Sequence, residues 1–249
     1  MLGKTSPFRF LPNVITCLNL FCGCLSIISS LNGRLEPAAY FILAASVFDF
    51  FDGFVARWLK AYSAMGKELD SLADVVSFGV APASIMYTLL LPATERLGLS
   101  IELFTCGWFI AMLAFVITIF SALRLAKFNI DTRQTDSFIG LPTPANALFI
   151  CSLAFVSTEN HPWAFFAENI FFLMAVIFLF SYLLVSELSL FSLKFKSFDW
   201  KKNQIRYVFI VFSALILILL HWAGLAAVIL VYIILSIFTN ILCNRKAST

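Results

Sequence analysis

Residues 49–74 read DFFDGFVARWLKAYSAMGKELDSLAD, and four aspartates stand out in this stretch. Asp49 and Asp52 are three residues apart, and Asp70 and Asp74 are four apart. If each segment is helical, each pair therefore lies on one face of its helix. An ionised side chain in an apolar segment is costly and is normally retained for a function or a partner. The stretch predicts two helices that bring four carboxylates to one place.

The chain around this stretch is strongly apolar. Of its 249 residues, 61% are hydrophobic and 12% are charged, whereas soluble domains are about half apolar and a quarter charged. A water-soluble fold of this length cannot bury so much apolar surface, so we expect the surrounding medium to be lipid. The formal net charge of +3 is too small to indicate a nucleic-acid partner. We therefore expect an integral membrane protein that contacts membrane lipids and binds no nucleic acid.

Eight apolar segments are long enough, or nearly so, to cross a bilayer. We expect them to be helices, because a helix satisfies its own backbone hydrogen bonds in lipid. The predicted fold is all-α, a polytopic transmembrane helical bundle of about eight spans. Residues 1–158 would form an N-terminal arm and a catalytic core, and residues 159–249 would add helices to the same domain. The expected spans are 14–31, 37–56, 71–91, 104–123, 142–158, 169–187, 206–221 and 224–242.

Basic residues alternate between the segments that join these spans. All but two of the 17 Lys and Arg residues lie in the two termini and in the loops after the second, fourth and sixth spans. The exceptions are Arg34 and Arg96. Because cytoplasmic segments carry an excess of Lys and Arg, we expect both termini to face the cytoplasm from the cell (inner) membrane. The four aspartates then lie near the cytoplasmic ends of the second and third spans.

Converging carboxylates repel one another unless cations neutralise them. Ligand sets made only of oxygen favour hard divalent ions such as Mg²⁺ or Mn²⁺, and a pair of such ions suits phosphoryl chemistry. Gly53 follows Asp52 directly, where the lack of a side chain leaves room for a diphosphate. Arg57 lies one turn further on, where its guanidinium can pair with phosphate oxygens. The spacing therefore predicts a site for two divalent ions and a diphosphate.

The same stretch resembles the motif of the CDP-alcohol phosphotransferase family, D-x2-D-G-x2-A-R-x8-G-x3-D-x3-D, at every fixed position. The matching residues are Asp49, Asp52, Gly53, Ala56, Arg57, Gly66, Asp70 and Asp74. The resemblance implies that the first three aspartates bind metal and that Asp74 is the catalytic base, which also faces a metal. It further implies contacts to the CDP-lipid from Gly53, Arg57 and the hydroxyl of Ser63. We expect a turn containing Ser63 and Gly66 to bring the two helices back antiparallel.

Four further runs narrow the resemblance to prokaryotic membrane-bound phosphatidylserine synthases. This resemblance implies CDP-diacylglycerol and L-serine as substrates, phosphatidylserine and CMP as products, and a homodimer. Those enzymes more often have Arg where this chain has Lys127, a difference that keeps the positive charge. The runs are LPNVITCLNLFCG (residues 11–23), SFGVAPA (77–83), RLAKFN (124–129) and FIGLPTPANA (138–147).

Two more pairs of residues are candidates for substrate contacts. Asn13 and Thr16, at the start of the first span, are candidates for hydrogen bonds to the cytidine or its phosphates, and the alternative is ordinary helix capping. Arg124 and Lys127 lie one turn apart at the cytoplasmic end of the fourth span. They are candidates to bind the serine carboxylate or a lipid phosphate, Arg124 first. The alternative is that both charges only set the topology.

Two other functions stay open at this point. An enzyme of the same family could use glycerol 3-phosphate, inositol phosphate or choline, although a phosphorylated acceptor is expected to need a denser basic cluster. A metal or proton transporter is expected to carry polar residues across the full depth of the bilayer. In this chain the four aspartates gather at one end of the spans instead. The sequence favours the serine-dependent transferase and does not distinguish Mg²⁺ from Mn²⁺.

Overall fold

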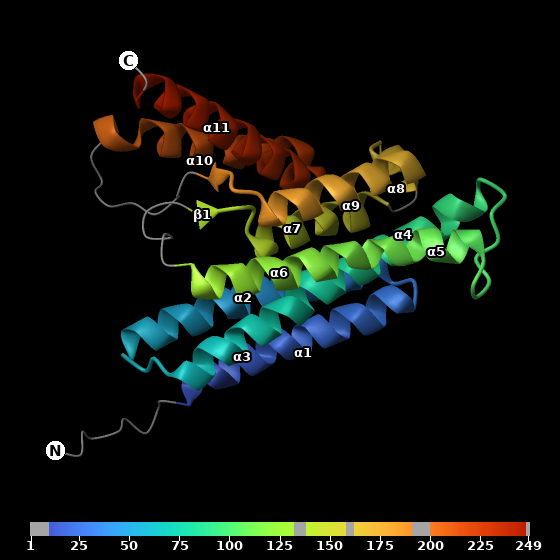
Figure 1. The fold of residues 1–249 in the computed structure, drawn as a ribbon, viewed down its shortest axis with the longest axis horizontal. Helices are drawn as coiled ribbons and strands as arrows, with labels where there is room; N and C mark the ends of the chain where they lie inside the picture. The colour runs from blue at the N-terminus through green and yellow to red at the C-terminus, as the bar shows by residue number, and fades with distance from the viewer. Residues whose placement is uncertain (1–9, 132–137, 158–161, 191–199, 248–249) are drawn as a thin grey trace.

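The computed structural model describes residues 10–131, 138–157, 162–190 and 200–247. These residues are mostly helical, and Figure 1 shows their arrangement. The elements in chain order are α1 (Leu11–Leu31), α2 (Leu35–Trp58), α3 (Ala64–Val75), the π-helical turn η1 (Val76–Val80), α4 (Ala81–Glu95), α5 (Cys106–Met112), the 3₁₀ turn η2 (Leu113–Phe115), α6 (Val116–Ile130), β1 (Phe138–Ile139), α7 (Thr143–Val156), α8 (Ala164–Glu168), α9 (Ile170–Val185), β2 (Ser189–Leu190), α10 (Trp200–Leu220) and α11 (Ala223–Ala247).

The eight expected spans all correspond to helices in the described residues. Five of these helices are long and apolar enough to cross a membrane: α1, α2, the continuous run Ala64–Glu95, the run Cys106–Ile130, and Ala223–Asn240 of α11. Three shorter apolar helices, Thr143–Val156, Ile170–Val185 and Arg206–Leu220, account for the others. The predicted all-α membrane protein is therefore confirmed. Of the basic residues behind the predicted orientation, Lys4, Arg9, Arg133, Lys194 and Lys196 lie outside the described residues.

The third span begins earlier than expected. Helix α3 starts at Ala64, because the Ser63 side chain caps it by accepting a hydrogen bond from the Gly66 backbone N–H at 2.9 Å. The prediction that Gly66 belongs to the turn is therefore wrong, since it lies in the first turn of the helix. The first two turns of α3 contain the charged residues Lys67, Glu68 and Asp70 and are largely exposed, so a search for apolar runs misses them.

Two short strands were not expected from the sequence. β1 pairs antiparallel with β2, so that Phe138 lies opposite Leu190 and Ile139 opposite Ser189. Strands of two residues are too short to leave a periodic pattern. Gly140 continues the connection with φ of +77° and donates its backbone N–H to Leu188 O at 2.9 Å. This pairing ties the start of α7 to the end of α9.

Helices α1, α2 and α3 pack along one side of the bundle, and α10 and α11 pair along the other (Figure 1). Helix α7 lies between these groups and contacts both α2 and α11. Helix α6 packs against α9 and also contacts α3. The described core is therefore continuous from α2 through α7 to α11, and the side of the bundle made by α1, α2 and α3 carries all four aspartates.

Small residues let η1 lie close to both α1 and α6. A Cβ added to Gly23 would lie 2.5 Å from Ser77 Oγ and 2.9 Å from Ser77 Cα. A Cβ added to Gly79 would lie 3.2 Å from the Cβ of Ser121. Small residues at such crossings let membrane helices pack backbone against backbone. The π-helical turn that directly follows α3 is therefore held between two helices.

Replacing Gly23 with Val is expected to destabilise the protein by about 1–3 kcal/mol, the usual cost of overpacking a tight interface. The reason is that the new side chain meets the backbone of Ser77, which cannot simply rotate away. The measurement is unfolding of the purified protein in detergent. Cys24→Val is the matched control, because Cys24 is the next residue on α1 and is exposed. Equal stability of the two variants would contradict this packing.

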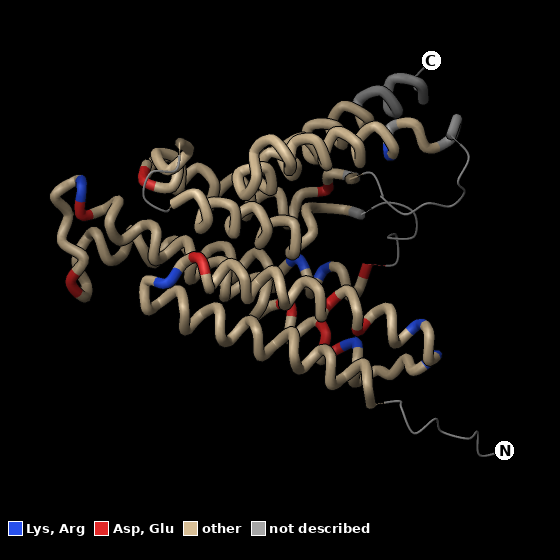
Figure 2. Tube along the Cα trace, turned by 180° about the vertical axis from the view of Figure 1, so that it is seen from behind, with Lys and Arg blue, Asp and Glu red and all other residues tan. Residues whose placement is uncertain are grey.

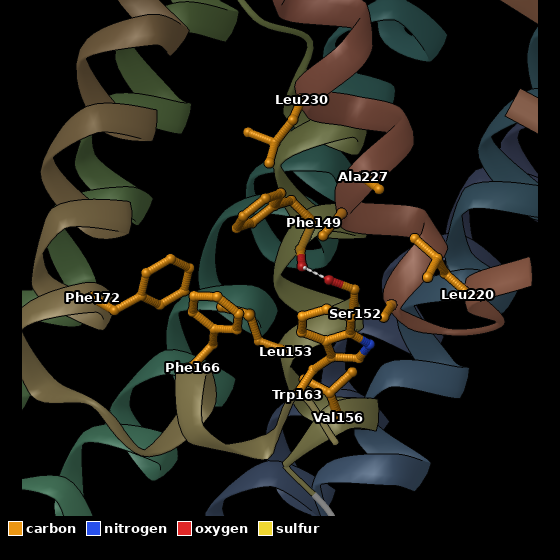
Figure 3. A pocket seen from close by; sticks show the side chains of 12 residues that line it. Phe149, Ser152, Leu153, Val156, Trp163, Phe166, Phe172, Leu220, Ala227 and Leu230 are labelled. Atoms are coloured by element: carbon orange, nitrogen blue, oxygen red, sulfur yellow. Dashed lines mark hydrogen bonds between the residues drawn. The ribbon is translucent and has the colours of Figure 1, made fainter. Parts of the chain in front are cut away.

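An apolar cavity of about 330 Å³ lies between α7, α8, α9 and the adjoining ends of α10 and α11 (Figure 3). Its wall includes the aromatic side chains of Phe149, Trp163, Phe166 and Phe172. The hydroxyl of Ser152 also lines it but donates to the backbone oxygen of Phe149 at 2.7 Å. This wall offers no ionisable group from the described residues, so the cavity is unsuited to acid–base or metal chemistry.

Candidate active site

Three of the four aspartates form a tight cluster where α2 and α3 meet α1. Asp49, Asp70 and Asp74 each offer a carboxylate oxygen, and these oxygens lie within 4.8 Å of one another. Asp49 and Asp70 are half-buried, and Asp74 is only 9% exposed. Figure 2 shows a group of acidic residues in this part of the bundle, while long stretches of the other helices carry no charge. The antiparallel return of the chain thus brings both predicted pairs together.

Asp52 adjoins this cluster without being part of it. It is 6% exposed, and its Oδ2 lies 2.7 Å from the hydroxyl oxygen of Thr16, which donates to it. Its charge nevertheless interacts with those of Asp49, Asp70 and Asp74. The site is therefore a cluster of three carboxylates with a fourth turned towards α1, rather than four equivalent ligands.

The donor set fits a divalent metal. All the clustered ligand atoms are carboxylate oxygens, which hard ions such as Mg²⁺ and Mn²⁺ prefer. The Oδ1 atom of Asp70 is buried and has no hydrogen-bond partner among the described residues. The ion pairs Arg96–Glu168 and Lys127–Glu187 do not involve these aspartates. Closely spaced carboxylates that are not in direct ion pairs are what a metal ion would neutralise.

A second cavity, of about 180 Å³, opens beside the carboxylates between α1, α2 and α3. It shares Asp52 and Asp70 with the acidic site. Four of the five residues expected to bind the CDP-lipid line it. The complete lining is Pro12, Asn13, Thr16, Asp52, Gly53, Ala56, Ala61, Tyr62, Ser63, Gly66, Lys67 and Asp70. This polar cavity joins the acidic cluster to the predicted nucleotide-binding residues.

The fifth of these residues, Arg57, lies beside the cavity and does not line it. Its side chain is exposed, and its Nη1 atom is 3.5 Å from the place that a Cβ on Gly53 would occupy. Its charge interacts with that of Asp52. The guanidinium therefore lies over the backbone of Gly53, next to the cavity. Ser63 is already engaged as the cap of α3, a second role that the sequence did not reveal.

The two basic residues on α6 differ in their surroundings. Arg124 is 8% exposed, stands 5.3 Å from the ring of Phe128, and interacts electrostatically with Asp74. Its Nε atom has no hydrogen-bond partner among the described residues. Lys127 is more exposed and forms an ion pair with Glu187 at 3.4 Å. Of the two candidates, Arg124 is thus the one whose charge reaches the acidic cluster.

Asn19 belongs to this site but was not among the predicted residues. It is fully buried in α1, and its Nδ2 atom donates to Asp74 Oδ1 at 3.5 Å. A signal was present in the sequence, because Asn13, Thr16 and Asn19 recur at every third residue and so share one helix face. Tyr62 and Lys67 also line the cavity without having been predicted.

Comparison with known proteins bears directly on this geometry. The family model described as CDP-alcohol phosphatidyltransferase matches residues 9–181, which include every residue of the acidic cluster and of the polar cavity. The chain belongs to this family. The match ends within α9, so the CDP-alcohol phosphatidyltransferase region covers α1 to α8 completely and leaves α10 and α11 outside it.

Among curated members of this family, similar proteins carry names that mention serine. The chain is 39% identical over 147 residues to the CDP-diacylglycerol–serine O-phosphatidyltransferase of Bacillus subtilis, covering 59% of this chain and 76% of that protein. It is 35% identical over 158 residues to the enzyme of that name from Helicobacter pylori, covering 63% and 62%. It is 36% identical over 151 residues to the archaetidylserine synthase of Methanothermobacter thermautotrophicus, covering 60% and 59%.

Proposed function

We propose that this protein transfers the phosphatidyl group from CDP-diacylglycerol to L-serine, with phosphatidylserine and CMP as products. The observation that carries the proposal is the cluster of Asp49, Asp70 and Asp74 beside a polar cavity, in a chain of the CDP-alcohol phosphatidyltransferase family. The similar proteins support serine as the acceptor, because the bacterial and archaeal relatives all take their names from serine.

We assign two divalent ions, Mg²⁺ or Mn²⁺, to the four aspartates. Asp49, Asp70 and Asp74 supply oxygens close enough to share an ion, and Asp52 stands beside them with an oxygen held by Thr16. When bound, such ions neutralise the carboxylates and stabilise negative charge on a diphosphate.

The polar cavity is the proposed site for the CDP group. Its polar lining lies at the end of the bundle, where the loop between α2 and α3 meets the start of α1. Asn13 and Thr16 offer hydrogen-bonding groups to the nucleotide from α1. The bare backbone at Gly53 leaves space for phosphate oxygens, and the nearby Arg57 guanidinium can pair with them. Ser63 borders the same cavity and can add a hydrogen bond from its hydroxyl.

In the proposed reaction the serine hydroxyl oxygen forms a bond to the phosphorus that carries the diacylglycerol. The bond from this phosphorus to the CMP oxygen breaks, and CMP leaves with the electron pair. Asp74 accepts the proton of the serine hydroxyl as the general base. Its carboxylate is the most buried of the clustered three and is held by Asn19 on one side. Arg124 supplies positive charge near it and is the candidate partner of the serine carboxylate.

We also propose that the site and the N-terminus face the cytoplasm in the cell (inner) membrane, and that two copies form a homodimer. The distribution of Lys and Arg supports the orientation, and the resemblance to phosphatidylserine synthases supports the dimer. In this orientation water-soluble serine and membrane-held lipid reach the aspartates from the same side.

An acceptor panel tests the proposed function. Purified protein with CDP-diacylglycerol and Mg²⁺ or Mn²⁺ is expected to release CMP with L-serine, and not with glycerol 3-phosphate, inositol phosphate or choline. Phosphatidylserine formation is followed in the same samples, and protein carrying Asp70→Asn sets the background. If CMP were released only with one of the other acceptors, that compound would be the substrate instead of serine, and the assignment as a CDP-alcohol phosphotransferase would stand. No release with any acceptor would contradict the transferase.

A further inference from the structure

Asn19 presents an unsatisfied hydrogen-bond acceptor next to the proposed base. The side chain is 0% exposed, and its Nδ2 donates to Asp74 Oδ1. This contact sets the amide orientation, because a carboxylate accepts from the NH₂ end and not from the oxygen. The Oδ1 atom is buried and has no hydrogen-bond partner among the described residues. Since buried polar atoms are almost always paired, a ligand that donates a hydrogen bond is expected at this oxygen.

Among the described residues, Arg124 offers an unpaired hydrogen-bond donor, where Asn19 offers an unpaired acceptor, and its charge also interacts with that of Asp74. Its guanidinium is buried in α6, and the unpaired donor is its Nε. A buried cation needs an anionic or strongly accepting partner. One unsatisfied acceptor and one unsatisfied cationic donor thus accompany a single carboxylate.

The π-helical turn η1 holds the two residues in place. Ser77 donates its hydroxyl to the backbone oxygen of Asn19 at 3.0 Å, which keeps α1 against η1. On the other side, Ser121 packs on Gly79 and lies one helical turn before Arg124. Because η1 directly continues the helix that carries Asp74, the three functional side chains are positioned by one shared element.

Resting on the proposed function, we propose that Asn19 binds the α-ammonium group of the acceptor amino acid through Oδ1. Arg124 binds the α-carboxylate, and Asp74 receives the hydroxyl proton. The three groups match the three polar groups of a small zwitterionic hydroxy amino acid. An acceptor such as glycerol 3-phosphate has no ammonium group to donate to Asn19, so the same pair of residues selects the amino acid.

The test is the kinetics of Asn19→Leu, a variant of similar size that cannot accept a hydrogen bond. The KM for serine is expected to rise roughly tenfold to hundredfold, the value of a hydrogen bond to a charged group. The kcat is also expected to fall, because the variant loses the hydrogen bond from Asn19 to the proposed base Asp74, so the serine KM is the readout of this inference. The KM for CDP-diacylglycerol is expected to stay unchanged. 3-Hydroxypropionate, which is serine without its ammonium group, is expected to compete equally well against the wild type and the variant. Ethanolamine is serine without its carboxylate. It is therefore expected to compete equally well against the wild type and the Arg124→Gln variant.

Ser26→Ala is the matched control, because Ser26 lies on the same buried face of α1 and donates only to the backbone oxygen of Ala38. It is expected to keep the serine KM. Asn19→Ala repeats the measurement if the Leu variant does not fold. An unchanged serine KM in a folded Asn19 variant would overturn this inference and leave the proposed function standing. Absence of serine-dependent CMP release from the wild type would overturn both.

Discussion

Replacing Asp74 with Asn is expected to lower kcat for serine-dependent CMP release by roughly 10²- to 10⁴-fold, the usual contribution of a general base. The amide has nearly the same shape but cannot take the hydroxyl proton. Asp74 is the residue to test because it is buried, contacts Asn19 and interacts with Arg124. The measurement is steady-state CMP release at saturating serine and CDP-diacylglycerol.

Glu68→Gln is the matched control for this experiment, since Glu68 is an exposed carboxylate on the same helix. It removes one negative charge without touching the cluster and should keep wild-type turnover. Turnover close to wild type in the Asp74→Asn protein would remove Asp74 from the role of base and leave it a metal ligand only.

Replacing Asp49 with Asn is expected to abolish detectable turnover and to weaken Mn²⁺ binding by at least about tenfold to hundredfold. Removing a residue that only hydrogen-bonds to a metal ligand typically lowers metal affinity by this factor, so removing a ligand itself should lower it at least as much. Asp49 provides one of the three oxygens that lie within 4.8 Å of one another, and an amide oxygen carries no negative charge for the ion. Mn²⁺ binding is measured directly by electron paramagnetic resonance in detergent, so the result does not depend on activity.

Thermal unfolding of the same Asp49→Asn protein separates a metal effect from damage to the fold. Without metal, the variant should be at least as stable as the wild type, because one of the mutually repelling carboxylates is gone. Added Mn²⁺ should raise the unfolding temperature of the wild type and have much less effect on the variant. The reason is that a ligand stabilises the folded state only to the extent that it binds to it. Equal stabilisation of both proteins by Mn²⁺ would contradict the assignment of Asp49 as a ligand.

Much of the candidate site was predictable because its chemistry is local in sequence. Asp49 and Asp52 lie on one helix and Asp70 and Asp74 on the next, so helical spacing and one short loop are enough to bring them together. Gly53 and Ser63 lie in the same stretch and line the adjoining cavity, and their contacts with the CDP-lipid stay a prediction. Asn13 and Thr16 line the cavity from α1, and their position at the start of the first span was the ground for naming them as candidates.

Other features depend on contacts that no local pattern encodes. Arg124 and Lys127 lie one turn apart and were both candidates for the serine carboxylate, yet Lys127 is paired with Glu187, which lies 60 residues further along the chain. Arg124 is buried and its charge interacts with that of Asp74, since α6 packs against the helix that carries this aspartate. Their different surroundings follow from helix packing, which brings residues distant in sequence into contact.

The sequence by itself determined the medium, the helices and the family of this protein. The chain has more apolar surface than a water-soluble fold can bury, so it must lie in lipid. Long apolar segments in lipid must be helical, because a helix satisfies its own backbone hydrogen bonds. The eight residues at fixed spacing match the motif of one family. Only the tertiary structure decided how the 49–74 stretch is used. It turned Asp52 towards Thr16, placed Arg57 beside the cavity, and brought Asn19 from α1 onto Asp74. For Asn19 the physical reason is the close approach of α1 to η1, which requires the small residues Gly23 and Ser77 at the crossing. For Asp52 it is the packing of α1 on α2, which brings Thr16 within hydrogen-bond distance.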